Sequence, residues 1–225
     1  MKRYFHHELE ELRKHLILMG ERTIDSVRLA VQALVSEDVS TAGQVIALDD
    51  EIDRLEVLID AECVRYITLR APVSHDVRLV TVAMKASHEL ERSGDEATAI
   101  AKRVRKLAEA GKIEEFCHIP RMADLALDML RDAMDSFITE DFDKASTVPR
   151  RDKEVDDLNR ENYVQLTDRI SSQSGGTTST IELIFISKSL ERIADHATNL
   201  AELVVFMVKG SDIRHPDSRS EGDKN

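Results

Sequence analysis

The sequence of 225 residues contains no tryptophan, only four prolines and eight glycines, and two cysteines. Cys63 and Cys117 show neither a CxxC pair nor the spacing of metal ligands, which argues against a disulfide framework and is typical of a reducing compartment. The scarcity of proline and glycine leaves few residues that interrupt helices. Alanine, leucine, glutamate, lysine and arginine are abundant instead, so the composition predicts an almost wholly helical chain.

Long apolar runs are also missing, because no segment approaches the ~18 consecutive apolar residues of a membrane-spanning helix. The first residues, MKRYFHHE, lack the apolar core of a signal peptide, so we expect a soluble, cytoplasmic protein. The net charge of −12 argues against a general nucleic-acid binder and against tight adsorption to anionic lipid. The sequence has no glycine-rich phosphate loop, Gly-x-Ser-x-Gly motif or catalytic Cys–His arrangement, and we predict that the protein is not an enzyme.

Apolar residues recur at steps of mostly three and four positions, which predicts six helices. Their expected ranges are 5–36, 40–69, 74–110, 120–139, 142–172 and 178–209. Pro72 should end the second helix, Ser74 should cap the third, and Gly111 should end the third. Because long helices joined by short connections pack antiparallel with their neighbours, we expect an all-α fold of two tandem three-helix bundles.

An internal repeat supports the division into two bundles. The motif Leu-Glu-Arg-x-x-Asp-x-Ala-Thr occurs once from Leu90 and again from Leu190. We therefore expect one bundle over residues 1–111 and a second over residues 112–210. The remaining residues, 211–225, form a polar tail that is expected to be disordered at its end.

Each half also carries two acidic pairs in which the residues are four positions apart, one Asp-xxx-Asp and one Glu-xxx-Asp. Carboxylates at this spacing lie one above the other on a helix, where like charges cost about 0.2 to 0.5 kcal/mol. A bound cation is the simplest reason to keep them. If the second and third helices of a bundle are neighbours, its two pairs converge into one patch of four carboxylates. Such oxygen ligands suit Mg²⁺, Ca²⁺, Mn²⁺ or non-haem iron better than structural zinc.

Solvated surface charge is the plain alternative, because the Glu-xxx-Asp pairs lie well away from the apolar stripe of their helices, with Asp49 and Asp53 on the flank of theirs, nearer the core. Their repetition in both halves favours a functional role. A buried di-iron centre is disfavoured, since no Glu-x-x-His pair accompanies them. His88 precedes Glu91 by three positions, but its counterpart in the second half is Lys188, so a surface histidine is favoured. His196 should point to a different face from Asp195.

Several motifs together resemble the PhoU family of bacterial phosphate-specific transport regulators over nearly the whole chain. They are the acidic blocks at 49–53 and 152–156, IDAEC at 59–63, RAPVSHDVRL at 70–79, the two Leu-Glu-Arg-x-x-Asp motifs and KGSDIRH at 209–215. The resemblance implies metal sites on two three-helix bundles, with iron, manganese, magnesium or zinc as the ion. The implied ligands are Asp49, Asp53, Glu91 and Asp95 in the first half and Asp152, Asp156, Glu191 and Asp195 in the second. Asn199 is a possible additional ligand of the second site, where the first copy has Ala99.

The resemblance further implies a negative regulator of the phosphate-starvation response and of phosphate uptake, often a homodimer. Its implied partners are the ATPase subunit of the phosphate ABC transporter and a phosphate sensor histidine kinase, and it would meet the membrane only through them. Two other hypotheses remain open at this point. One is a carboxylate-bridged metal hydrolase or oxidase, and the other is a metal-free helical scaffold whose acidic pairs face lysine and arginine residues of a partner.

Overall fold

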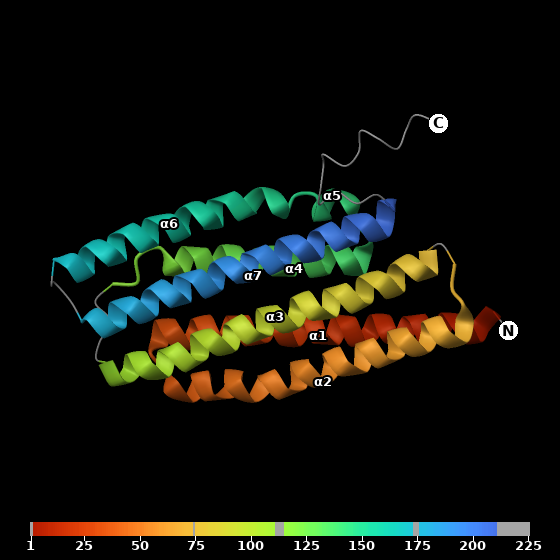
Figure 1. The fold of residues 1–225 in the computed structure, drawn as a ribbon, viewed down its shortest axis with the longest axis horizontal. Helices are drawn as coiled ribbons and strands as arrows, with labels where there is room; N and C mark the ends of the chain where they lie inside the picture. The colour runs from red at the N-terminus through yellow and green to blue at the C-terminus, as the bar shows by residue number, and fades with distance from the viewer. Residues whose placement is uncertain (1, 74, 111–114, 173–175, 211–225) are drawn as a thin grey trace.

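The computed structural model describes residues 2–73, 75–110, 115–172 and 176–210, which form six long helices and one helix of a single turn (Figure 1). The helices are α1 (Lys2–Ser36), α2 (Val39–Arg70), α3 (His75–Ala110), α4 (Ile119–Thr139), α5 (Phe142–Ala145), α6 (Pro149–Ser171) and α7 (Thr177–Lys209). No strand occurs in these described ranges. The predicted all-α fold class is therefore confirmed.

One predicted helix, 142–172, is wrong as a single element. The short helix α5 ends at Ala145, residues 146–148 form a turn, and α6 begins at Pro149. Proline lacks a backbone N–H and its ring clashes with the carbonyl four residues earlier, so it cannot lie inside a helix without cost, whereas it suits the first helical position. The side chain of Asp141 caps α5 by accepting a hydrogen bond from the Lys144 N–H.

The ends of α2 follow the sequence closely. Asp38 caps its N-terminus, because its carboxylate accepts hydrogen bonds from the Ser40 N–H at 2.8 Å and from the Thr41 hydroxyl at 2.5 Å. Ala71 ends the helix in the left-handed region with φ 43°, directly before Pro72. The predicted cap at Ser74, the predicted stop at Gly111 and the tail at 211–225 lie outside the described residues.

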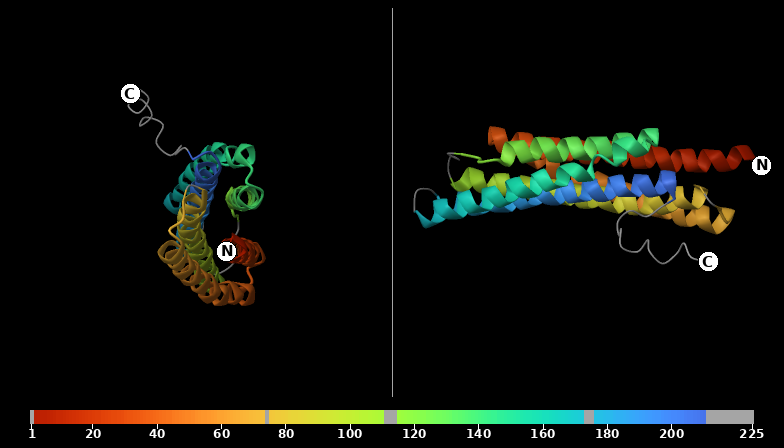
Figure 2. Two further views of the ribbon diagram at one scale, coloured as in Figure 1. Left: turned by 90° about the vertical axis from the view of Figure 1, so that its right-hand side faces the viewer. Right: turned by 90° about the horizontal axis from the view of Figure 1, so that it is seen from above.

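The helices pack in two groups that share a long contact. α1, α2 and α3 contact one another, α6 and α4 both contact α7, and α5 packs on α4 and α7. α3 and α7 lie side by side and join the two groups (Figure 1). Figure 2 shows the bundle from its end and from above, with α1 and α4 on the same side of the α3–α7 pair, where they also contact each other. The fold is thus two three-helix groups joined side by side.

A single continuous apolar core runs through both groups. Leu16, Leu90, Met134 and Leu190, from four different helices, are each no more than 3 % exposed. α1 and α4 approach so closely at Gly20 that a Cβ atom there would lie 2.3 Å from the Met134 Cε. This shared burial couples the stability of the two halves. Among the described residues, no helix has the length and apolarity to cross a membrane.

Charged pairs also connect the halves across the α3–α7 contact. Arg103 on α3 contacts Glu182 on α7 at 2.7 Å, and Glu182 is only 8 % exposed. Arg192 on α7 contacts Glu96 on α3 at 2.9 Å. These pairs help to fix the register of α3 against α7, which decides which side chains of the two halves meet.

Candidate metal sites on the two halves

The first acidic patch, formed by Asp49, Asp53, Glu91 and Asp95, lies where α2 packs on α3. The helices approach closely here, because a Cβ atom on Gly94 would lie 3.0 Å from the Ile52 Cδ1. Burial and then the neighbouring negative charges of Asp95 and Glu56 together raise the pKa of Glu91 to about 7. The structure thus brings side chains from the two acidic pairs of this half into electrostatic contact.

The two aspartates that α2 contributes to the first patch differ in their surroundings. Asp49 is half-buried and accepts a hydrogen bond from the Thr98 hydroxyl at 3.0 Å. Burial raises its pKa above the ordinary value, against the lowering effect of that hydrogen bond, and the charge of Asp95 adds to the increase. Asp53 is exposed, yet partial desolvation and then the charges of Asp49 and Asp95 raise its pKa as well. The patch therefore carries unfavourable negative charge at neutral pH.

The second acidic patch, formed by Asp152, Asp156, Glu191 and Asp195, lies where α6 packs on α7. Burial and then the negative charges of Asp195, Asp156 and Glu191 together raise the pKa of Asp152 to about 6. Burial and then the charge of Glu191 also raise the pKa of Asp195. All four predicted residues of this half therefore lie close enough to influence one another.

A divalent cation fits these patches on the chemistry of their donors. The Oδ1 atom of Asp152 is buried and has no hydrogen-bond partner among the residues that the structure describes, which is uncommon for a buried polar atom. Carboxylate oxygens are the ligands that Mg²⁺ and Mn²⁺ prefer, and non-haem iron also accepts them. A bound ion would neutralise the repulsion within each patch and would give the Asp152 oxygen a partner. The ligand roles of the eight carboxylates stay predictions.

One carboxylate of the second patch already has a cationic neighbour. The Lys188 ammonium contacts both oxygens of Glu191, at 2.5 and 2.6 Å, from one turn earlier on α7. An ion that binds Glu191 would have to compete with this contact. In the first patch the corresponding position holds His88 rather than lysine.

The residues near Asn199 contact the other half of the chain. The Asn199 Nδ2 donates a hydrogen bond to the Glu89 Oε2 at 3.1 Å, and the His196 Nδ1 lies 2.8 Å from the same oxygen. His196 therefore faces α3, which agrees with the expectation that it points away from Asp195. The amide nitrogen of Asn199 faces Glu89 in this structure. The role of Asn199 as an additional metal ligand stays a prediction.

Sequence reasoning missed one neighbour of the first patch, Glu56. It lies three residues after Asp53 and seven after Asp49 on α2, which is the spacing of one helix face. Its Oε1 is 3.2 Å from the His88 Nδ1, and His88 lies 3.9 Å from the Glu91 Oε2. The signal that could have found it is this heptad spacing, which extends the Asp-xxx-Asp pair by one turn.

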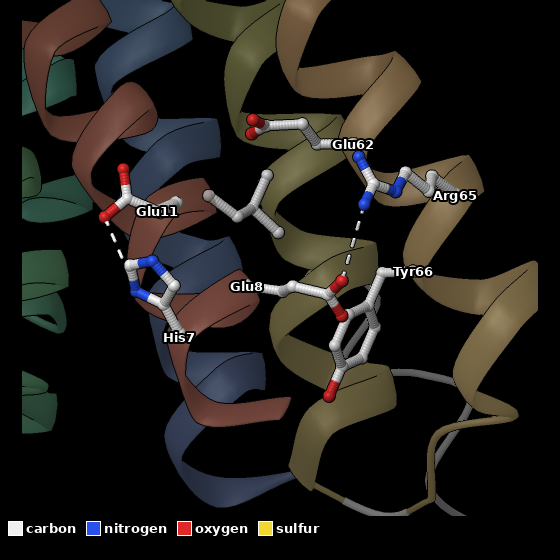
Figure 3. A pocket seen from close by; sticks show the side chains of 7 residues that line it. His7, Glu8, Glu11, Glu62, Arg65 and Tyr66 are labelled. Atoms are coloured by element: carbon white, nitrogen blue, oxygen red, sulfur yellow. Dashed lines mark ion pairs between the residues drawn. The ribbon is translucent and has the colours of Figure 1, made fainter. Parts of the chain in front are cut away.

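A small cavity of about 170 Å³ lies between α1 and α2, away from both patches (Figure 3). Its acidic side chains already have partners: Glu8 contacts Arg65 at 3.7 Å, and Glu11 lies 3.8 Å from His7. Glu62 on its wall is nine residues from Asp53, about 14 Å along the helix. Glu62 itself lies 2.9 Å from the His15 Nδ1. The cavity is therefore separate from the candidate metal sites, and each of its carboxylates has a basic neighbour.

Comparisons with known proteins match most of the chain. The PhoU domain matches residues 16–104 and again residues 119–204, so the duplication expected from the motifs is confirmed. The phosphate-specific transport system accessory protein PhoU homolog of Pseudomonas putida is 38 % identical over 212 residues, covering 94 % of this chain and 83 % of the relative. The accessory protein PhoU of Escherichia coli (strain K12) is 34 % identical over 219 residues, covering 94 % of this chain and 88 % of that protein.

Solved structures agree. The crystal structure of PhoU from Pseudomonas aeruginosa superposes with a TM-score of 0.90 at 36 % identity, covering 92 % of this chain and 100 % of that one. The phosphate transport system regulatory protein PhoU from Streptococcus pneumoniae gives 0.86 at 28 % identity, with coverages of 94 % and 100 %. These relatives are named as accessory or regulatory proteins and not as enzymes, in agreement with the prediction from the sequence.

Proposed function

The chain belongs to the PhoU family, and from this premise we propose that it is a cytoplasmic regulator of phosphate uptake. In this role it couples the phosphate ABC transporter to a sensor histidine kinase and dampens the phosphate-starvation response when phosphate is plentiful. The names of its relatives support the link to phosphate-specific transport. The direction of regulation and the two partners are part of the proposal.

The observation that carries the proposal is the pair of acidic patches, one on each half. Burial raises the pKa of Glu91 in the first and of Asp152 in the second, which is unusual for carboxylates kept at a protein surface. Surface carboxylates that only solubilise a protein do not need to be packed against one another. Their packing supports a role in which a cation binds and the loaded patch then meets a partner.

The carboxylates of each patch would hold the ion, and the ion would supply positive charge between two helices. In the first half it would link α2 to α3 through Asp49, Asp53, Glu91 and Asp95. In the second it would link α6 to α7 through Asp152, Asp156, Glu191 and Asp195. Mn²⁺ and Mg²⁺ match the oxygen donors best, and non-haem iron also accepts them. A cross-linked helix pair presents a more rigid surface, which lowers the ordering cost of binding a partner.

Two further parts of the proposal concern assembly. We place the ATPase subunit of the transporter and the kinase on the metal-bearing faces of α2–α3 and α6–α7. We also propose a homodimer, because exposed apolar side chains are concentrated on the outer side of α2. Val57 is 68 % exposed and Val64 is 55 % exposed, and the two are seven positions apart on one face of that helix.

Metal content per chain is the direct test. The wild type and the double variant Glu191→Ala with Asp195→Ala are purified without chelator or affinity-tag histidines and measured by inductively coupled plasma mass spectrometry. We expect metal in the wild type and less of it in the variant. The matched control replaces Asp124 and Asp128, an acidic pair of the same spacing on α4 outside both patches, and should leave the metal content unchanged.

A pull-down of the transporter ATPase with the same proteins tests docking. Loss of the ATPase together with the metal would make the ion part of the docking surface. Absence of metal from every protein would contradict the metal sites. It would favour the metal-free scaffold, in which the acidic pairs face basic residues of a partner, and the Lys188–Glu191 contact is an example of such pairing within the chain.

A further inference from the structure

The two halves differ at the edge of their acidic patches. The repeat offset is 103 residues between α2 and α6, since 156 − 53 = 103, and 100 residues between α3 and α7, since 191 − 91 = 100. By these offsets Glu56 corresponds to Asn159 and His88 corresponds to Lys188. The first half thus has a carboxylate and an imidazole where the second has an amide and an ammonium group.

The three side chains at this edge of the first patch converge. The His88 Nδ1 is 3.2 Å from the Glu56 Oε1 and 3.9 Å from the Glu91 Oε2. One ligand atom from each of the three residues lies within 4.8 Å of the other two. Glu56 comes from α2, whereas His88 and Glu91 are one turn apart on α3, so the arrangement bridges two helices.

These separations are near those of atoms bound to one metal ion. Ligands at bond lengths of about 2.0 to 2.2 Å, arranged octahedrally or tetrahedrally, are separated by roughly 3.0 to 3.5 Å. The His88–Glu56 separation falls in this range, and the His88–Glu91 separation needs to shorten by about half an ångström. His88 has the freedom to make this adjustment, because its side chain is 60 % exposed.

Space for an ion and its water ligands is present on the same side. A cavity of about 590 Å³ is lined by Glu56, His88 and Glu89, and by Asn199 from the second half. Glu89 is already engaged by His196 and Asn199, whereas Glu56 and His88 face each other at the cavity wall. An ion from solvent therefore reaches the imidazole without displacing a buried side chain.

The corresponding position of the second half cannot offer the same ligands. The Lys188 ammonium contacts both carboxylate oxygens of Glu191, at 2.5 and 2.6 Å. The Asn159 Oδ1 accepts a hydrogen bond from the Ser187 hydroxyl at 2.8 Å. A lysine ammonium has no lone pair for a metal, and this half has no nitrogen ligand beside its carboxylates at this edge.

We propose that Glu56, His88 and Glu91 form a mixed nitrogen and oxygen site for a transition-metal ion such as Zn²⁺, present on the first half alone. This site rests on the proposed function, because Glu91 also belongs to the first acidic patch. Imidazole suits zinc, copper, nickel and iron, whereas oxygen ligands alone suit Mg²⁺, Ca²⁺ and Mn²⁺. The two halves then differ in metal selectivity: the first takes a metal with affinity for imidazole, and the second keeps a site for hard cations.

The competing interpretation is that His88 only forms ion pairs with the two glutamates. Both interpretations predict that His88 lies near Glu56, but they differ in what an added metal does. In the ion-pair interpretation Zn²⁺ binds to carboxylates, and replacing the imidazole leaves the Zn²⁺ affinity unchanged. In the proposed site, replacing it weakens Zn²⁺ binding and has little effect on Mg²⁺.

The first experiment uses the full chain, freed of metal with chelator, after removal of any affinity tag. Zn²⁺ and Mg²⁺ affinities are measured by isothermal titration calorimetry for the wild type and His88→Gln. We expect the Zn²⁺ affinity to fall about tenfold or more and the Mg²⁺ affinity to change less than about twofold. His118→Gln is the matched control, because His118 also contacts a carboxylate, Glu161 at 3.3 Å, but lies on the second half.

Nuclear magnetic resonance of ¹⁵N-labelled histidine supplies a readout that does not depend on affinity. The signal that His88→Gln removes identifies the His88 ring nitrogens, and one Zn²⁺ per chain should shift it strongly. An unshifted His88 signal, or a Zn²⁺ affinity of His88→Gln within twofold of the wild type, would overturn the site. The double variant Glu191→Ala with Asp195→Ala tests the metal site of the proposed function instead. Failure of the proposed zinc site and failure of the proposed function therefore give different results.

A reciprocal exchange tests sufficiency. Asn159→Glu with Lys188→His gives the second half the three ligand types of the first, and we expect this variant to bind one additional Zn²⁺ per chain. His88→Lys gives the first half the lysine of the second and should lose its Zn²⁺. Far-ultraviolet circular dichroism confirms the fold of each variant, and a folded exchange variant without additional Zn²⁺ would contradict the assignment.

Discussion

Replacing Asp152 with asparagine should stabilise the metal-free protein at neutral pH. Burial and then the charges of four neighbouring carboxylates raise the pKa of Asp152 from 3.8 to about 6. A carboxyl group with a raised pKa in the folded state opposes folding whenever it is ionised, because the unfolded chain loses its proton more readily. Its Oδ1 is also buried, with no hydrogen-bond partner in the described part of the chain. The asparagine side chain would carry no charge, and its amide N–H groups can donate to the surrounding carboxylates.

The magnitude follows from the size of the pKa difference between the folded and the unfolded state. A difference of about 2 in pKa corresponds to about 3 kcal/mol at 1.36 kcal/mol per pKa unit, as an upper limit. Asp152 is only partly buried, so solvent screening reduces this to about 1 kcal/mol. For a chain of this length, 1 kcal/mol raises the melting temperature by about 2 to 4 °C.

The pH dependence has a definite sign. Below pH 3.8 the group is protonated in both the folded and the unfolded state, and Asp152 has no electrostatic cost. Between pH 3.8 and about pH 6 the folded state binds more protons than the unfolded state, so stability from this group falls as pH rises. The advantage of the variant should therefore be small near pH 4 and complete above about pH 7.

The assay is thermal and urea unfolding in chelator at about pH 4 and pH 7.5, followed by circular dichroism at 222 nm. Asp124→Asn, an exposed aspartate on α4, is the control and should change stability little. Saturating Mn²⁺ should reverse the order, because a ligand at 100 times its dissociation constant stabilises the wild type by about 2.7 kcal/mol. A variant equal to or less stable than the wild type in chelator at pH 7.5 would refute the reasoning.

Three further predictions concern packing and the contact between the halves. Gly20→Val should destabilise the protein by about 1 to 3 kcal/mol in urea unfolding, because the added Cβ would meet the Met134 side chain. Adding Met134→Ala to this variant should recover part of the lost stability, and no recovery would contradict this account. Arg103→Ala should lower the free energy of unfolding by about 2 kcal/mol or more, since the carboxylate of Glu182 would stay largely buried without its main partner. An unchanged melting temperature would show that this ion pair is dispensable for stability. Burial raises the pKa of the Cys63 thiol to about 12, so iodoacetamide at pH 8 should label Cys63 only after the protein unfolds. The label is detected by mass spectrometry of peptides, and labelling of Cys63 in the native protein would contradict the prediction.

The helical class, the two halves and most helix boundaries could be predicted because they depend on local and periodic features. Apolar residues every three to four positions specify a helix whichever partner it packs on, and Asp38 and Pro72 mark the ends of α2 through groups within a few residues. Pro149 carries a signal of the same local kind. The prediction of one helix over 142–172 followed periodicity alone and did not weigh that proline, which is why it was wrong.

The candidate sites could be predicted in part. Spacing of four positions places Glu91 above Asp95 on any helix, so each acidic pair was readable from the sequence. Heptad spacing places Glu56 on the same face of α2 as Asp49, but it does not say which side chain of α3 lies opposite. Its meeting with His88 depends on how deeply α2 and α3 pack together, which in turn depends on contacts such as Ile52 against Gly94.

By itself the sequence determined that this protein is helical, duplicated and marked by acidic pairs, because each of these properties is encoded by residues close together along the chain. Only the tertiary structure decided that one core unites the halves, that His196 and Asn199 of the second half face Glu89 of the first, and that Lys188 contacts Glu191. The physical reason is that the first set depends on helix periodicity, whereas the second depends on the packing register between helices and on side-chain conformation. Both are fixed by the volumes of residues far apart in the sequence.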